Sequence, residues 1–207
     1  MADRALPGRL GIRARRIEWY SIAITVAEAA IAIPLALSSG SVALLGFGLD
    51  SLIEVGSAAT LLWLLAGIHD ARHEERADRA LRIVGALLVA LALYILADSA
   101  WTLMHHAVPA RTILGAALLA VTIVVMLIMT RAKRGIAREL GSDAMEADAK
   151  QSEFCAYLSV IALVGLGLNL ALGWWWADPA AALVMVPLIV REGVEALRGE
   201  ACSHVSK

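Results

Sequence analysis

The chain has 207 residues, 60% of them hydrophobic, and its mean hydropathy is +0.74. A soluble domain carries about 45–50% apolar residues, so this composition predicts a membrane protein with several spans. The formal net charge of −1 gives no electrostatic reason to bind nucleic acid, and two cysteines exclude a disulfide framework.

Six segments are apolar enough to cross the roughly 30 Å hydrocarbon layer of a bilayer, which takes about 20 helical residues. In chain order they cover residues 19–37, 42–68, 81–104, 112–130, 147–172 and 175–196. Every connector between them is short. We therefore expect an all-α integral membrane protein in which one domain of six transmembrane helices covers residues 17–198. A basic tail over residues 1–16 precedes this domain, and a short tail over residues 199–207 follows it.

Lysine and arginine are unevenly distributed over the connectors. All of them except Arg111 fall on one side of a six-span topology. The connector between the fourth and fifth spans, for example, contributes Arg131, Lys133, Arg134 and Arg138. Because cytoplasmic loops carry an excess of lysine and arginine, we expect both termini to be cytoplasmic in a multi-pass protein of the cell (inner) membrane.

Two carboxylates interrupt the second span. In the stretch GLDSLIEVG, Asp50 and Glu54 are four residues apart and therefore share one face of a helix. Two like charges repel there unless a proton or a divalent cation neutralises them. We therefore predict a cation or proton site at this pair. Glu28 and Asp98 stand alone in their spans, and for them a functional role and a structural hydrogen bond to a neighbouring helix remain equal alternatives.

The fifth span carries a second set of metal-ligating side chains. Asp148, Gln151 and Cys155 have the spacing of one helical face, and the last two repeat the four-residue separation of Asp50 and Glu54. Zinc takes four ligands, so a second helix should complete the site. The Cys155 thiol is either a small buried apolar group or a soft metal ligand, and the second reading is favoured beside Gln151. Asp148 is expected to act as an access point or an alternative ligand.

These features resemble the cation diffusion facilitator family of proton-coupled exporters of zinc and related metals. The family's second span typically reads small-Asp-Gly-x-(His/Asp)-Ser-x-x-Asp, and residues 46–54 match it with Asp50 and Glu54 at the ligand positions. The fifth span typically reads Ala-Asp-Ala-x-His-x-x-x-Asp, and residues 147–155 match it with Gln151 and Cys155 in place of the usual ligands. The Trp-Ala-Asp-Pro stretch at residues 176–179 also resembles the start of the family's sixth span.

The resemblance covers nearly the whole chain and implies a short, divergent member that lacks the C-terminal cytoplasmic domain. It implies an efflux transporter for a divalent metal, with zinc expected, protons as counter-ion and the metal site between the second and fifth spans. The metal is cargo, so no prosthetic group is expected, and the partners are the metal ion, protons and the lipid bilayer. A homodimer remains open.

Two other classes of function compete with metal transport. A non-transporting membrane metal sensor or accessory subunit on a transporter-like scaffold is the alternative. An enzyme is not expected, because the HEER stretch before the third span lacks the second histidine of a zinc protease motif. No serine–histidine pair that could act as a nucleophilic centre lies within the predicted spans either.

Overall fold

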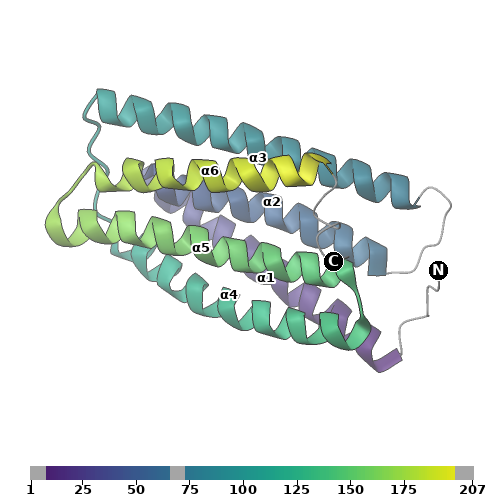
Figure 1. Cartoon of the computed structure of the whole chain (residues 1–207). Coiled ribbons are helices and arrows are strands. Elements are labelled where there is room, and N and C mark those ends of the chain that lie inside the picture. Colours follow the sequence, from purple (N-terminus) through teal and green to yellow (C-terminus); the bar gives the residue numbers. More distant parts are fainter. Residues whose placement is uncertain (1–7, 66–72, 199–207) are drawn as a thin grey trace.

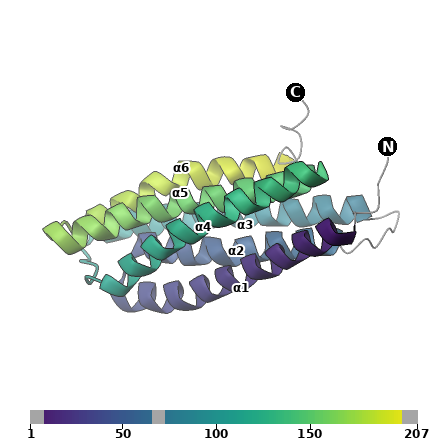
Figure 2. The same cartoon turned by 90° about the horizontal axis from the view of Figure 1, so that it is seen from below.

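The computed structural model describes residues 8–65 and 73–198, and this part of the chain contains six α-helices and no strand. The helices are α1 (Gly8–Ser39), α2 (Val42–Leu65), α3 (His73–Met104), α4 (Ile113–Leu140), α5 (Asp143–Leu172) and α6 (Ala177–Arg198). They run up and down through one elongated bundle, and α1 begins at the same end at which α6 ends (Figures 1 and 2). The prediction of an all-α membrane protein with six helices is confirmed.

Three helices extend by eight or more residues beyond the apolar segments that predicted them. α1 already begins at Gly8, within the predicted basic tail, α3 begins at His73, and α4 continues from Thr130 to Leu140. Alanine, arginine, leucine and lysine are all good helix formers, so a helix does not end where its sequence becomes polar. An apolar window marks only the part of a helix that suits hydrocarbon. Residues 66–68, at the end of the predicted second span, lie outside the described residues.

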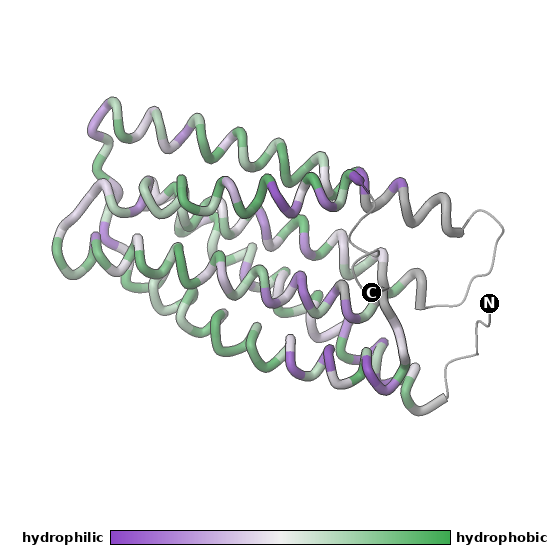
Figure 3. The backbone as a smooth tube through the Cα atoms, viewed as in Figure 1, coloured by the Kyte–Doolittle hydropathy of each residue, from purple (hydrophilic) through white to green (hydrophobic). Residues whose placement is uncertain are grey.

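Five of the helices, α1 to α5, contain a stretch long and apolar enough to cross a membrane, which makes the chain a multi-pass integral membrane protein. α6 does not meet the same criterion within the described residues. Asp178 near its start and Arg191, Glu192 and Glu195 near its end leave a short apolar stretch between them. In Figure 3, hydrophilic residues gather along the last turns of α4, while its first turns are apolar.

α2 lies at the centre of the bundle. It packs against α1, α3, α5 and α6, whereas α4 packs mainly against α5, and α3 against α6. Two glycines before Asp50 allow this close packing: a Cβ on Gly46 would lie 2.8 Å from Ile95 of α3, and one on Gly48 would lie 2.9 Å from Ile33 of α1. Small residues let membrane helices approach in this way. The acidic segment of α2 is therefore enclosed on several sides.

A side chain of α6 fixes the position of α2 along the bundle. The Asp178 carboxylate accepts a hydrogen bond of 2.6 Å from the Ser41 hydroxyl and one of 2.8 Å from the backbone N–H of Val42. Backbone N–H groups in the first turn of a helix have no partner within the helix, so a carboxylate there is a stabilising cap. Asp178 belongs to the Trp-Ala-Asp-Pro stretch, and it joins the first turns of α2 and α6.

Candidate metal centre

The two carboxylates of α2 are buried among the described residues with few polar neighbours. Asp50 is 0% exposed and Glu54 is 1% exposed, and none of their four carboxylate oxygens meets hydrogen-bond geometry within the described part of the chain, although the Cys155 thiol lies near enough to interact with Glu54. A structural role would require a hydrogen bond to a neighbouring helix, because burying a carboxylate without one costs several kcal/mol. Within the described residues neither carboxylate has such a hydrogen bond, so the structure gives no support to a purely structural role for this pair.

α5 brings Cys155 to the same region. α5 packs against α2, and the Cys155 side chain is fully buried in the core between them. Glu54 and Asp50 are the two carboxylates that act most strongly on the Cys155 thiol. Gln151 lies one turn away on α5 and is half-buried. The packing of α5 against α2 therefore puts Cys155 in the same part of the bundle as Glu54 and Asp50, and Gln151 lies one turn from Cys155 along α5.

These side chains do not form a closed coordination shell in this arrangement. Among residues 8–65 and 73–198, no three histidine, cysteine, aspartate or glutamate side chains are close enough together to hold a metal ion. Coordination by Asp50, Glu54 and Cys155 would therefore require their side chains, or the helices that carry them, to move closer together. The assignment of these three residues and Gln151 as ligands remains a prediction.

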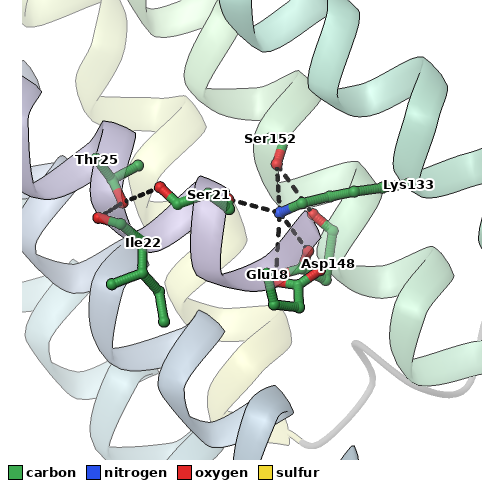
Figure 4. A network of polar contacts seen from close by, with 7 residues as sticks. All are labelled: Glu18, Ser21, Ile22, Thr25, Lys133, Asp148 and Ser152. Carbon is green, nitrogen blue, oxygen red and sulfur yellow. Dashed lines mark hydrogen bonds and ion pairs between the residues drawn. The ribbon is translucent and has the colours of Figure 1, made fainter. Parts of the chain in front are cut away.

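Asp148 already has a cationic partner. Its Oδ2 atom lies 2.5 Å from the Nζ atom of Lys133, which is fully buried on α4. The ammonium of Lys133 also lies 2.9 Å from Ser21 Oγ, 3.1 Å from Ser152 Oγ and 3.7 Å from Glu18 Oε2. As Figure 4 shows, these oxygens surround the ammonium from α1 and α5. In this arrangement Asp148 belongs to an ion-pair network, and its role as access point or alternative ligand remains a prediction.

The assignment of Lys133 to the connector between the fourth and fifth spans was wrong, because Lys133 belongs to α4, and Glu18 was not among the predicted site residues. α4 continues past Thr130, so Lys133 belongs to a helix. The helix buries one face, to which Thr122, Met126, Met129, Lys133 and Ala137 belong. That spacing of three and four residues was visible in the sequence and could have located the lysine. A topology argument that only counts lysine and arginine residues assigns each of them to a water-exposed connector.

The two isolated acids have different surroundings. Glu28 of α1 is buried, and its Oε1 atom accepts a hydrogen bond of 2.8 Å from Thr122 of α4, while Oε2 has no partner within the described residues. Glu28 also acts electrostatically on Glu54 and Cys155. Asp98 accepts a hydrogen bond of 3.2 Å from Tyr94 at the exposed side of α3. Glu28 therefore borders the candidate centre, whereas Asp98 makes a local contact.

Comparison with known protein families agrees with this architecture. The model of the cation efflux transmembrane domain matches residues 19–201, which is most of the chain. The chain belongs to the cation efflux family. The match confirms the resemblance drawn from the second and fifth spans and supports a cation efflux transporter rather than a classical enzyme. A search among curated proteins found none that matches this cation efflux protein.

Proposed function

We propose that this cation efflux protein exports a divalent metal, with zinc as the main cargo, through a site between α2 and α5. The observation that carries the proposal is the buried pair of Asp50 and Glu54 on α2, whose oxygens meet no hydrogen-bond geometry in the described residues, on the helix that packs against α5 with its buried Cys155. Carboxylates together with a soft thiolate suit zinc, cadmium and cobalt better than manganese, which prefers oxygen ligands alone. The Gln151 carbonyl oxygen would supply the fourth ligand of a tetrahedral site.

Proton exchange follows from the same ligands. Carboxylates and a thiol must be deprotonated to bind metal, so protons and metal compete for the site. Protons that enter from outside would displace the metal, and the neutralised site could return to the cytoplasmic side. Metal binding also removes the repulsion between Asp50 and Glu54, and this difference in free energy can bias the inward-facing and outward-facing states.

Uptake into proteoliposomes that contain only this protein tests the proposal. With an outward-directed proton gradient across the vesicle membrane, we expect zinc and cadmium uptake well above that of manganese, and we expect uptake to fall when the gradient is collapsed. Vesicles with the Asp50→Asn/Glu54→Gln double variant are the matched control for leakage. Absence of uptake for every metal, despite metal binding by the purified protein, would favour the sensor or accessory-subunit function instead.

Orientation in the membrane can be tested by cysteine labelling. We expect single cysteines placed near Arg138 to react from the cytoplasmic side and those placed near Trp175 to react from the outside, since lysine and arginine concentrate at cytoplasmic ends. Cys155 and Cys202 would first be replaced by serine. Reversed labelling would overturn the proposed orientation and the direction of transport, and labelling of both positions from one side would show that α5 does not cross the membrane.

A further inference from the structure

The interior of the bundle is strongly acidic. Within the described residues, six carboxylate side chains are buried but only one basic side chain, that of Lys133. The buried acids are Glu18, Glu28, Asp50, Glu54, Asp148 and Asp178. Asp178 is satisfied by hydrogen bonds at the start of α2. Of the other five, Asp148 and Glu18 lie within 4 Å of the Lys133 ammonium, and Glu54 interacts with it from further away. The position of this one positive charge therefore affects how tightly the neighbouring acids hold a cation.

Lys133 is held in place by three helices. It extends from α4 to Ser21 and Glu18 on α1 and to Asp148 and Ser152 on α5 (Figure 4). Two carboxylates and two hydroxyls form an oxygen cage of the kind that a metal cation would occupy, and the ammonium fills it. Unlike a dissolved ion, this cation is covalently attached and cannot leave.

The cage adjoins the candidate metal centre. On α5, Asp148 and Ser152 alternate with the proposed ligands Gln151 and Cys155, so the two sites share two turns of one helix. The ammonium of Lys133 and the carboxylate of Glu54 also act on each other electrostatically. A positive charge at this position attracts the empty carboxylates and repels a divalent cation bound to them.

We propose that Lys133 is a tethered cation that weakens the binding of metal at Asp50, Glu54 and Cys155 and thereby allows its release. The inference rests on the proposed function of that site and assigns to Lys133 a positioning and electrostatic role without direct metal contact. A transporter needs a site that empties in each cycle, and three buried anionic ligands without a nearby positive charge would release zinc slowly. Stability alone does not explain the lysine, since well-packed apolar residues can often replace buried ion pairs without loss.

The test is the Lys133→Met variant, which keeps much of the side-chain volume and removes the charge. We expect the purified variant in detergent to bind zinc at least about tenfold more tightly in calorimetry, because a unit charge within roughly 20 Å of a divalent cation changes its binding by a factor of ten or more at an effective dielectric constant of about 20. In proteoliposomes, KM should decrease together with the maximal rate of zinc uptake, because release becomes slower. A lysine needed only for packing predicts the opposite, namely weaker binding or loss of folded protein. Unchanged or weaker zinc binding by folded Lys133→Met overturns the proposal.

Glu18→Gln supplies a test of opposite sign that does not depend on the folding of Lys133→Met. Glu18 is not a proposed ligand, and its Oε2 atom lies 3.7 Å from the ammonium of Lys133. This variant keeps the ammonium but removes a carboxylate that offsets its charge, so zinc binding should weaken. Tighter or unchanged binding by Glu18→Gln would contradict the inference.

Glu54→Gln separates this inference from the proposed function. If Glu54→Gln binds zinc like the unmodified protein, the site itself is wrong. If zinc binding requires Glu54 but does not tighten in Lys133→Met, only the role of Lys133 fails.

Discussion

Replacement of Asp50 by asparagine or of Glu54 by glutamine is expected to abolish metal transport and to leave the folded bundle intact. Replacing residues that only support metal ligands already costs about 10–100-fold in affinity, so loss of a ligand should reduce zinc uptake by at least about 100-fold. Neither carboxylate has a hydrogen-bond partner in the described residues that the substitution would leave unsatisfied. Removal of one charge also relieves a repulsion on the order of a few kcal/mol.

Two measurements check this expectation. Zinc uptake is compared in proteoliposomes with matched amounts of folded protein, and thermal unfolding in detergent is expected at the same or a higher temperature. Asp98→Asn is the matched control, since Asp98 is an acid on α3 whose hydrogen bond to Tyr94 lies at the exposed side of the helix. It should transport like the unmodified protein. Wild-type uptake by either α2 variant would show that the metal does not bind at this pair.

Cys155→Ser is expected to weaken zinc and cadmium binding more than manganese binding. A serine hydroxyl remains neutral and is a poorer ligand for soft metals than a thiolate. Cys155→Asp introduces the residue that is usual at this position in the family and should recover zinc transport, with broader acceptance of manganese. The measurement is the uptake of zinc, cadmium and manganese by each variant, normalised to the amount of folded protein, which shows which of the two variants transports better.

A purely packing role for Cys155 predicts the reverse order. The thiol is fully buried, so serine, which is close in size, would then be tolerated, whereas a new buried carboxylate would be costly. Ser159→Ala controls for altered packing on the same helix, because Ser159 is buried one turn further along α5 and donates only to the Cys155 carbonyl oxygen. Wild-type behaviour of Cys155→Ser with every metal, together with failure of Cys155→Asp, would remove Cys155 from the ligand set.

The number and location of the helices could be predicted because hydrocarbon requires long apolar segments, and each of the six segments became one helix. The start of α1 and the end of α4 could not be predicted in this way. Hydropathy falls at the point where a helix leaves the hydrocarbon layer, and both helices continue beyond that point. The burial of Lys133 depends on this difference. Its partners on α1 and α5 are far away in the sequence, so no local pattern relates them.

At the candidate centre, helical periodicity placed Asp50 and Glu54 on one face and Gln151 and Cys155 on another. It did not indicate which neighbour each face meets, and this required the packing of α2 against α5. The ion pair between Asp148 and Lys133 could not be predicted from the sequence either, since the two residues belong to different helices. A face can be derived from spacing, but its partner depends on tertiary structure.

The cap that Asp178 forms on α2 has a geometric consequence. Because the first turn of α2 is tied to α6, any tilt of α2 relative to α6 pivots about Val42, and displacement increases with distance from that point. At 1.5 Å per residue, Asp50 lies about 12 Å and Glu54 about 18 Å along the helix axis from the pivot. A given tilt therefore swings Glu54 about one and a half times as far as Asp50. A tilt that preserves this cap therefore changes the position of Glu54 relative to α5 more than that of Asp50, so in the site proposed above Glu54 would be the first of the two carboxylates to move away from the metal.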